Sequence, residues 1–414
     1  MGGLECGREY FLAPGLGVKL PSLVLLSKND KMTRQIFSIS LLALALGATA
    51  QEKKEKQINR GFGNIGLVYP VSTTGINAPN CRNYFSANAI GGISYDELAF
   101  CGAGVANIVR HDAKGLIAAG FSNHIGNEAA GLQAAGFANT VKRHAKGIQA
   151  AGFFNYSGSM KGAQFAGFAN VTTGEVEGIQ GAGFGNIASD ADVQLSGFIN
   201  RACNANTQGA GFINVAHNVK GCQLSGFINV AEKVEGVQVA GFINIADSCD
   251  YPIGLINIVR KGEMTLGVTV DEGLTTMVSF RSGGKKLYGI IGVGANIQQS
   301  TTAYDDGFWP FYALEGGLGA HFNFGKNFRV NLEGIATSLS DFYVGYYLRT
   351  SLRVLPSVTI GEHTEIFAGI TFNVEESNIY GSYGLSNNYI WGTDIFNGRS
   401  SFYIGAMAGL AYKF

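Results

Sequence analysis

Two different patterns of apolar and polar residues follow one another along the chain. From residue 104 to 260, a fixed frame of apolar and amide residues recurs every 13 to 16 residues, as in GCQLSGFINVAEKVEGVQVAGFINIA between Gly221 and Ala246. From residue 261 onward, apolar and polar residues alternate one by one over long segments. A period of two residues is typical of β-strands, and no stretch shows sustained helical periodicity. The patterns predict an all-β chain with two different halves.

The recurring unit is Gly-Phe-x-Asn, and it is preceded by Gln. The glycines of the unit are Gly120, Gly136, Gly152, Gly167, Gly183, Gly197, Gly211, Gly226 and Gly241, with outer copies at Gly104 and Gly254. Asn is the third residue after every one of these glycines, and Gln is the third residue before eight of them. The residues that we expect to form a structural ladder are Asn123, Asn139, Asn155, Asn170, Asn186, Asn200, Asn214, Asn229, Asn244, Gln223 and Gln238.

A repeat this short cannot bury its own apolar face, so neighbouring repeats must stabilise it. In a β-solenoid each repeat forms one coil, equivalent residues lie about 4.8 Å apart, and Asn side chains bond along a ladder. Phe, Val and Ile are then expected to fill the interior. The alternative is an antiparallel meander with one repeat per strand, inside a single large sheet or barrel. We favour the solenoid because the connecting segments all resemble one another, whereas connections in a membrane meander alternate between two environments.

The C-terminal region, 261–414, shows the alternation of a β-barrel. In the last segment, Phe402, Ile404 and Leu410 share an entirely apolar face, and comparable apolar faces lie opposite Arg329 and Arg349. Apolar residues outside and charged residues inside are typical of a transmembrane barrel. Eight strands are expected at 264–270, 274–281, 286–298, 311–325, 327–338, 342–355, 365–374 and 401–414. Tight connections are expected at 282–285 and 325–327, and long loops at 299–310 and 375–400.

A barrel of eight strands has an interior that side chains fill. The charged residues expected on its inward face are Glu315, Arg329, Glu333, Arg349 and Arg353. We interpret them as ion pairs that close the lumen rather than as a catalytic or transport site. A soluble sandwich would place the same charges outward, and the strand period alone does not decide between the two. Strand length, aromatic residues near the strand ends and an export signal favour the membrane barrel.

The N-terminal region carries that export signal at residues 32–50. Arg34 gives a basic start, 36–46 is an almost unbroken apolar run, and Ala48-Thr49-Ala50 has the small residues of a cleavage site. We expect cleavage after Ala50. Residues 1–31 are interpreted as a mis-assigned start without structure, 51–60 as a linker, 61–103 as strands that cap the repeats and 104–260 as the repeat region.

Composition and motifs argue against several functions. Lys and Arg number 30 and Asp and Glu number 30, so nothing favours electrostatic capture of nucleic acid. GFGNIG at 61–66 matches GxGxxG but precedes no amphipathic helix, so a dinucleotide site is not expected. His111, His124, His144 and His217 are interpreted mostly as solvated turn residues without metal-ligand spacing. Nothing resembles a nucleophile motif such as GxSxG. The expectation is a protein that is not an enzyme and binds no cofactor or metal.

The repeat units carry a family resemblance. GVQxAGFxNVA, the preceding IGLVYPVSTTG and NYFSANAIGGIS, and the closing PIGLINIVRKGE resemble a family of bacterial surface-repeat proteins of Gram-negative species, over most of residues 61–262. The resemblance implies association with the outer membrane. It implies no particular chemistry, because the family has no established activity.

Three functions are compatible with these patterns. The first is a non-enzymatic structural or interaction protein of the outer membrane of a Gram-negative bacterium, built from stacked β repeats on a small barrel. Its repeat region is then expected either in the periplasm or on the cell surface. The second is a transport channel in which the repeats join one large barrel. The third is a surface protein that binds or acts on glycans through the aromatic-rich loops. The partners expected are outer-membrane lipid, together with peptidoglycan, envelope proteins, or host or glycan ligands.

Overall fold

The structure is a computed structural model, and it describes residues 58–284, 286–296, 311–340, 342, 346–377, 389–395 and 398–414. The expected mis-assigned start, signal peptide and most of the linker lie outside these residues. The chain divides into two compact units near residue 144. Of the described residues, 58–144 belong to one unit and those from 145 onward to the other. None of them forms a helix with the length and hydropathy that a membrane crossing needs.

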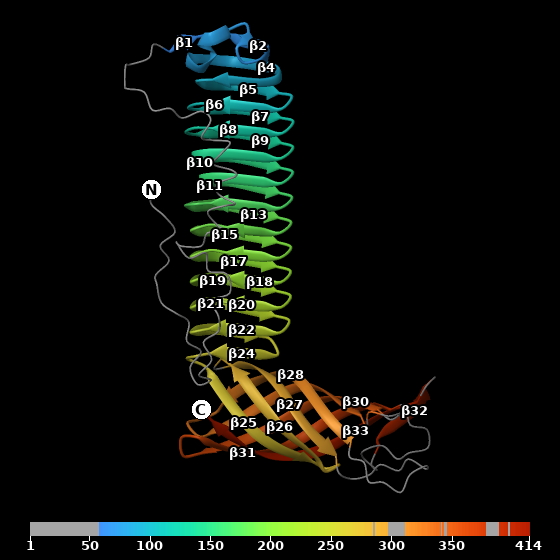
Figure 1. Cartoon of the computed structure of the whole chain (residues 1–414). Coiled ribbons are helices and arrows are strands. Elements are labelled where there is room, and N and C mark those ends of the chain that lie inside the picture. The colour runs from blue at the N-terminus through green and yellow to red at the C-terminus, as the bar shows by residue number, and fades with distance from the viewer. Residues whose placement is uncertain are drawn as a thin grey trace. The chain divides into compact units, whose positions relative to one another are not determined.

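The repeats form a β-solenoid region of about 12 turns (Figure 1). Most coils have a longer strand that carries the Gln and a short strand that carries the Asn, and in two coils both residues lie on one continuous strand. Equivalent strands of successive coils pair in parallel, with Gln223 opposite Gln238 and Asn229 opposite Asn244. The solenoid prediction is therefore confirmed. The alternative, a single antiparallel sheet or barrel that includes the repeats, is wrong because the strands of successive repeats run parallel with identical residues in register.

The first unit contains the N-terminal coils. Its cap includes a short 3-10 helix, and its long strand β4 pairs in parallel with both β5 and β6. The elements are β1 Asn59–Arg60, β2 Gly63–Val68, β3 Val71–Ser72, η1 Gly75–Asn80, β4 Cys81–Ser94, β5 Asp96–Ala103, β6 Ala106–Val109, β7 Ala113–Ala119, β8 Ser122–Ile125, β9 Ala129–Ala135 and β10 Ala138–Ala151, the last of which ends in the second unit.

The second unit contains coils of the same kind. Their strands are β11 Phe154–Ala166, β12 Ala169–Thr172, β13 Glu175–Ala182, β14 Gly185–Ile187, β15 Asp190–Ser196, β16 Ile199–Arg201, β17 Asn204–Ala210, β18 Ile213–Val215, β19 Asn218–Ser225, β20 Ile228–Val230, β21 Lys233–Ala240, β22 Ile243–Ala246, β23 Ser248–Ile253 and β24 Ile256–Val259. Most of these strands are short because each coil bends twice.

The interior of the solenoid differs from the expectation. The Asn and Gln side chains point inward and are buried, whereas Phe198 and Phe212 remain 41% and 36% exposed. Phe follows the Gly at a bend, where its side chain points outward. The short strand begins only after the Phe, so the bend interrupts the alternation and the Asn two positions after the Phe points to the interior instead of sharing its face. The expectation that Phe fills the interior is therefore wrong. The Ile of the unit is only partly buried in several coils, as at Ile228, because it stands next to the inward Asn and points the other way.

Glycine at the Phe bend is required by the close approach of successive coils. A Cβ built at Gly197 or Gly211 would lie 2.2 Å from the carbonyl oxygen of the equivalent glycine one coil earlier. The second glycine of the repeat has a different reason, because Gly178 and Gly236 have φ values of 130° and 143°. Only glycine adopts that backbone region readily. Both glycine positions of the repeat therefore follow from backbone geometry.

The C-terminal region closes into a barrel of eight antiparallel strands, as predicted. The strands are β25 Glu263–Asp271, β26 Thr275–Gly283, β27 Leu287–Asn296, β28 Phe311–Asn323, β29 Phe328–Ser340, β30 Tyr346–Ile360, β31 Thr364–Ser377 and β33 Gly398–Lys413. Pairing of β25 with β33 closes the circle. A further strand, β32 Trp391–Ile395, pairs with β33 outside the circle.

The strands differ from the expected positions at two places. The strand expected at 342–355 runs from Tyr346 to Ile360, and Phe342 lies outside it with a φ of 62°, a value that an extended strand excludes. The segment 375–400, expected to be a loop, contains β32 and the ends of β31 and β33. Pairing continues there because β32 folds back on β33, with Asp394 opposite Arg399. The expected loop at 299–310 lies outside the described residues.

The last coil of the solenoid packs directly on one end of the barrel. The backbone N–H of Asn257 donates to Ser282 Oγ at 3.0 Å, and Asn257 Nδ2 donates to the Ser282 carbonyl oxygen at 3.2 Å. Gly289 allows this contact, because a Cβ there would lie 2.1 Å from the Gly254 carbonyl oxygen. The start of β25 and the C-terminus lie at the same end, since Glu263 stands opposite Gly283 and Thr265 opposite Lys413.

Candidate functional site: buried amide ladders, barrel interior and an exposed aromatic column

The Asn side chains form a hydrogen-bonded ladder inside the solenoid. Nδ2 of Asn214 donates to Oδ1 of Asn229 at 3.0 Å, and Nδ2 of Asn229 donates to Oδ1 of Asn244 at 3.0 Å. Asn229 Nδ2 also reaches a backbone carbonyl oxygen of the next coil, that of Val239, at 2.7 Å. Every ladder Asn expected from the sequence is fully buried. The period of the repeat thus places one amide per coil where its neighbours satisfy it.

A second ladder, made of Gln, has the opposite direction. Gln238 Nε2 donates to Gln223 Oε1 at 2.8 Å, and Gln223 Nε2 donates to Gln208 Oε1 at 2.8 Å, so the donors point toward the N-terminus. The Asn donors point toward the C-terminus. Amide dipoles aligned in opposite directions offset one another, which limits the field along the interior. The Gln ladder ends where Pro252, which has no amide side chain, stands opposite Gln238.

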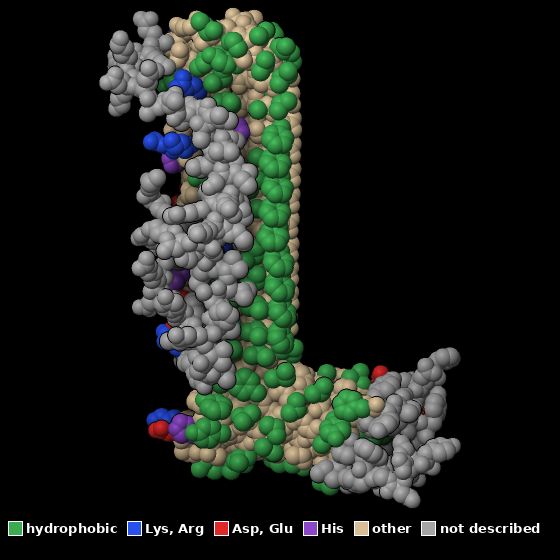
Figure 2. All heavy atoms as spheres, viewed as in Figure 1, with side chains coloured by type: hydrophobic (Ala, Val, Ile, Leu, Met, Phe, Trp, Pro, Cys, Tyr) green, Lys and Arg blue, Asp and Glu red, His purple; other side chains and the backbone are tan. Residues whose placement is uncertain are grey.

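In several later coils the interior near the other bend is apolar. Ala216, Val219, Ala231 and Val234 are buried together there. Outside this bend lie charged pairs, which are Lys161 with Glu177, Lys233 with Glu235, His217 with Glu232, and Arg260 with Asp247. A coil therefore has one charged bend and one Phe bend. Figure 2 shows hydrophobic side chains as a column along the coils and charged groups along the opposite edge.

The Phe side chains stack on one another outside the solenoid. In the second unit the column consists of Phe153, Phe168, Phe184, Phe198, Phe212, Phe227 and Phe242, with successive ring centroids 4.8 to 5.2 Å apart. In the first unit, Phe121 and Phe137 stack at 4.8 Å. Aromatic pairs contribute about 0.5 to 1.5 kcal/mol beyond their area burial. The column therefore stabilises the stack of coils while leaving a continuous aromatic surface open.

The interior of the barrel contains a charged cluster. Arg281 Nε donates to Glu333 at 2.8 Å, Tyr288 Oη donates to Glu333 at 3.0 Å, and Arg353 donates to Glu315 at 2.9 Å. Arg353 also lies 3.8 Å from Glu333, which joins the two pairs. Three of the five residues that the sequence placed inside, Glu315, Glu333 and Arg353, meet in this cluster.

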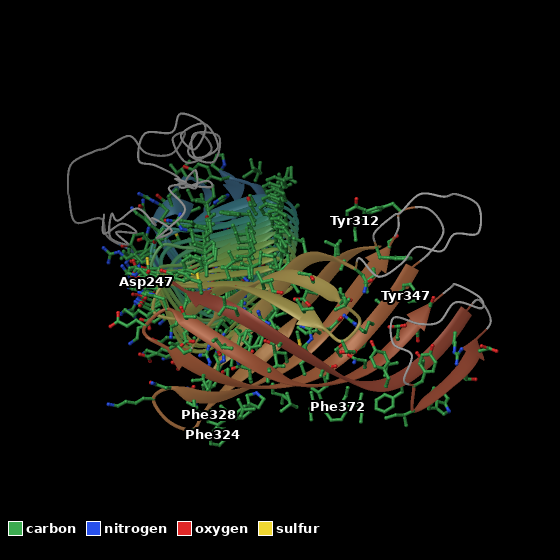
Figure 3. All side chains as sticks on the ribbon, turned by 90° about the horizontal axis from the view of Figure 1, so that it is seen from below. Asp247, Tyr312, Phe324, Phe328, Tyr347 and Phe372 are labelled. Carbon is green, nitrogen blue, oxygen red and sulfur yellow. The ribbon has the colours of Figure 1, made fainter. Side chains whose placement is uncertain are left out.

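Arg329 and Arg349 belong to two other clusters. Arg329 pairs with Glu365 and lies 2.6 Å from Glu263, near the end where the solenoid packs. Arg349 pairs with Asp271 at 2.7 Å, at the other end of β25. All five residues predicted to face the lumen are buried, but they form three groups rather than one. In Figure 3, Phe324 and Phe328 lie toward one end of the barrel and Tyr312 and Tyr347 toward the other.

Several partners in these clusters were not identified from the sequence. They are Glu263, Asp271, Arg281, Tyr288 and Glu365. The sequence pattern does indicate an inward position for Arg281, because Met277, Ser279 and Arg281 are every second residue of one strand and therefore share its buried face. Glu263, Asp271 and Glu365 stand at or next to strand ends, where the alternation is too short to assign a face. The lumen of the described barrel is therefore filled by more ion pairs than the sequence indicated.

A buried carboxyl group distinguishes the N-terminal cap. Glu97 stands opposite Asn83 and Ala113, in a column that is apolar in later coils. Ser86 Oγ donates to Glu97 Oε1 at 2.6 Å, and Asn83 Nδ2 donates to the same oxygen at 3.3 Å. Burial raises the pKa of Glu97 from its ordinary value of 4.5 to about 7, and the hydrogen bonds only partly oppose the rise.

This raised pKa predicts a pH-dependent stability of the cap. The pKa of Glu97 is higher in the folded chain than in the unfolded chain. Protonated Glu97 therefore contributes stability below pH 4.5, and this contribution is lost as the pH rises through about 7. The loss is on the order of 3 kcal/mol. Glu97→Gln removes it, so this variant should melt at a higher temperature than the wild type at about pH 8, with a smaller difference at about pH 4. Circular dichroism melts of residues 51–414 measure the melting temperatures at the two pH values.

The exposed Glu128 offers the matched control for this prediction. Glu128→Gln also removes one carboxylate from the first unit, but its side chain is not buried, so the melting profile should follow that of the wild type. If Glu97→Gln shifted the melting temperature equally at both pH values, titration of Glu97 would not be the cause of the shift.

A cluster of Asp96, His111 and Asp112 lies beside this cap. One ligand atom from each lies within 4.8 Å of the others, an arrangement that the sequence spacing did not show. Asp96 contacts His111 Nδ1 at 3.0 Å, pairs with Arg82 at 2.7 Å and accepts the N–H of Asp112 at 2.9 Å. The cluster is therefore a set of mutually paired groups that ties successive coils together.

His124 differs from the expectation of a solvated turn residue. It lies in strand β8 and is partly buried, with Nδ1 2.8 Å from Thr140 Oγ1 and Nε2 3.0 Å from Ser122 Oγ. Burial lowers the pKa of His124. The interpretation is wrong here because residue 124 directly follows a ladder Asn, so it belongs to the short strand of its coil.

The amide ladders, the charged clusters of the barrel and the cap cluster are networks that stabilise the fold, and the Phe column is an exposed surface. Comparisons of the chain with protein-family models, with curated proteins and with solved structures found no match. The resemblance of the repeats to bacterial surface-repeat proteins therefore stays a prediction. For function, the chain offers a barrel with a filled interior and an apolar exterior, and a solenoid with an exposed aromatic column.

Proposed function

We propose that the chain is a non-enzymatic outer-membrane protein in which the barrel is the anchor and the solenoid meets other components of the cell envelope. The observation that carries the proposal is the polarity of the barrel. Val268, Leu318 and Ile404 on its outer surface are about half exposed, whereas Arg349 and Arg353 are buried in its interior. A soluble barrel would have the reverse arrangement, so an apolar phase outside is the environment that fits.

The aromatic residues support the same proposal. Phe324, Phe328 and Phe414 are exposed near one end of the strands, and Tyr312 and Trp391 are exposed near the other. Aromatic girdles at both ends of an apolar band are typical of barrels in the outer membrane, where the rings lie at the level of the lipid headgroups. The interior is closed by paired charges, so the barrel serves for anchoring rather than for conduction.

The connections between strands favour one side of the membrane for the solenoid. The connections at 284–286, 324–327 and 361–363 are all short, and they are at the end where the C-terminus and the last solenoid coil lie. The opposite end has the three-residue connection 272–274, the five-residue connection 341–345 and the two longest connections, 297–310 and 378–397, the second of which contains β32. In outer-membrane barrels the short turns face the periplasm and the long loops face outward. The proposed location of the solenoid is therefore the periplasm, with peptidoglycan or an envelope protein within its reach.

Labelling of single cysteines on intact cells tests this location. The mature chain has five cysteines, which are first replaced by alanine. Lys233→Cys is then placed at the charged bend of a coil, and Thr393→Cys in β32 at the opposite end of the barrel, both at exposed positions. A membrane-impermeant maleimide should label position 393 and leave position 233 unlabelled, because the outer membrane shields the periplasm.

Two controls make this experiment decisive. Both variants should react after the outer membrane is opened, and the cysteine-free chain should not react at all. Labelling of position 233 on intact cells would place the solenoid on the cell surface and overturn the periplasmic location. Recovery of the mature chain in the soluble fraction, rather than with the outer membrane, would overturn the anchor itself.

A further inference from the structure

The Phe bend of the second unit presents an extended apolar surface, which we call the aromatic face. Its rings are between 36% and 41% exposed, and the neighbouring side chains are exposed to a similar degree. The aromatic face consists of Phe153, Phe168, Phe184, Phe198, Phe212 and Phe227 with the flanking Ile148, Phe165, Ile179, Leu195 and Leu224. The rings have a fixed spacing because the hydrogen-bonded coils set it.

The area of this face matches one side of a stable protein interface. A buried Phe covers about 200 Å², so a ring that is two-fifths exposed leaves roughly 80 Å² open. The eleven side chains together expose on the order of 800 Å². The largest apolar patch of a typical monomer is about 300 to 600 Å². A stable complex buries about 800 Å² on each partner. The aromatic face is therefore larger than a free surface normally is, and has the size that one protein partner covers.

The chemistry of the face argues against lipid and against glycan as its occupant. Four positions of each coil are decisive over the seven coils from Ile148 to Ile243: the residue before Gln, the residue after Gln, the Phe and the residue after the Phe. None of these positions carries a charged side chain, and the polar residues among them are Thr207 and Cys222. Lipid-surface helices flank their apolar face with Lys and Arg, and sugars need hydrogen-bonding groups beside a stacking ring. Here the charged groups are at the opposite bend of each coil.

The period of the face indicates what does cover it. Successive rings are 4.8 to 5.2 Å apart over seven coils. A partner with any other period would lose register with the rings after a few coils. A second copy of the same chain has the same period and stays in register along the whole face. Two copies related by a two-fold axis along the solenoid would bring each ring close to its own equivalent, which is a self-complementary contact.

We infer that the aromatic face is a dimer interface, in which two copies of this chain pack side by side along their Phe columns. The parallel orientation of the two copies rests on the proposed function, since it requires both barrels in one membrane. The pairing of the faces rests only on the area, chemistry and period of the column. The dimer would leave the charged bends of both copies outward and free for other partners.

Crosslinking at a single cysteine tests the dimer. The full mature chain, without its native cysteines, is reconstituted at a high lipid-to-protein ratio in phosphatidylcholine vesicles and treated with a short bifunctional maleimide. Leu195→Cys lies on the aromatic face and is half exposed, whereas the control Asn206→Cys lies at the charged bend and is also exposed. The expected result is several-fold more covalent dimer from Leu195→Cys than from Asn206→Cys.

A charge placed on the face distinguishes a specific contact from crowding. Leu224→Lys, added to the Leu195→Cys chain, should abolish the dimer because equal charges meet at the same height. Mixing that chain with a Leu195→Cys chain carrying Leu224→Glu should restore it as a mixed dimer. Circular dichroism checks that the solenoid remains folded in each variant, and a variant that fails to fold is replaced by the Leu224→Ser chain, whose dimer should be weakened.

The outcomes separate the two proposals. Equal yields from positions 195 and 206, with both reacting fully with a monofunctional maleimide, would overturn the dimer. Protection of position 195 in vesicles without a dimer product would overturn it too and would indicate lipid as the occupant. A chain that folds but stays outside the vesicles contradicts the membrane anchor alone, and the crosslinking yields are then read on the soluble chain.

Discussion

Glu333→Gln is expected to destabilise the barrel by about 3 to 5 kcal/mol, because breaking a buried ion pair leaves an uncompensated charge. Glu333 is fully buried and accepts from Arg281 Nε at 2.8 Å and from Tyr288 Oη at 3.0 Å. The amide of Gln keeps the volume of the side chain but removes its negative charge. Arg281 and Arg353 then lie in the lumen without Glu333 to compensate them.

Tryptophan fluorescence is the measurement that isolates the barrel. The chain contains two tryptophans, Trp309 and Trp391, and both belong to the C-terminal region. Equilibrium unfolding in urea, in detergent micelles, should therefore show a lower midpoint for Glu333→Gln in fluorescence. The matched control is Glu177→Gln at the solenoid surface, which removes a solvated pair with Lys161 and should leave the midpoint nearly unchanged.

A double variant tests the physical reason for this loss. Arg281→Met together with Glu333→Gln removes the positive charge as well, and should recover part of the stability lost in Glu333→Gln alone. A coupling of about 0.5 to 3 kcal/mol between the two sites is expected for residues in one network. Additive losses, or an unchanged midpoint for Glu333→Gln, would mean that the lumen is wet enough to solvate these charges.

The second large effect is expected from Asn229→Leu, with a loss on the order of 2 to 5 kcal/mol. Asn229 accepts from Asn214 at 3.0 Å and donates to Asn244 at 3.0 Å and to the Val239 carbonyl oxygen at 2.7 Å. Leu leaves these neighbours without their partner in a dry interior, at about 1 to 3 kcal/mol for each buried group. The loss therefore spreads to the two adjacent coils.

Far-UV circular dichroism of residues 51–414 reports this change, because most strands of the described residues lie in the solenoid. Asn206→Leu is the control: Asn206 is an exposed Asn, and its bond to Asp192 at 2.9 Å lies at the charged bend. It should leave the melting temperature nearly unchanged, and both variants should leave tryptophan fluorescence of the barrel unchanged. Equal melting temperatures for Asn229→Leu and the wild type would show that water replaces the missing amide.

The positions of the ladder residues were predictable from the spacing of the repeat. A fixed Asn at the third position after each Gly, with Gln at the third position before it, predicts identical residues in register, and parallel coils provide this. The opposite donor directions of the two ladders were not predictable. They depend on the side-chain rotamers and on which neighbouring carbonyl oxygens are within reach, and neither is encoded in the spacing.

The Phe side chains lie on the side of the coil opposite to the prediction. Large apolar residues are usually buried, so an interior filled by Phe was expected, whereas the amides occupy it and Phe198 is 41% exposed. Which side of the chain faces inward depends on the direction of the bend at the preceding glycine. The period of the repeat is the same for both directions, so the pattern could not distinguish them.

Periodicity along the chain was enough to predict the solenoid, the eight strands of the barrel and the residues that alternate toward its lumen, because periods of two residues and of one coil follow from backbone geometry. Which charges meet inside the barrel depends on how the strands close. Arg281 and Glu333 are 52 residues apart and Arg329 and Glu263 are 66 residues apart, and their side chains meet only after the circle has closed. Strand order, shear and closure set such distances, and local sequence pattern carries no information about them.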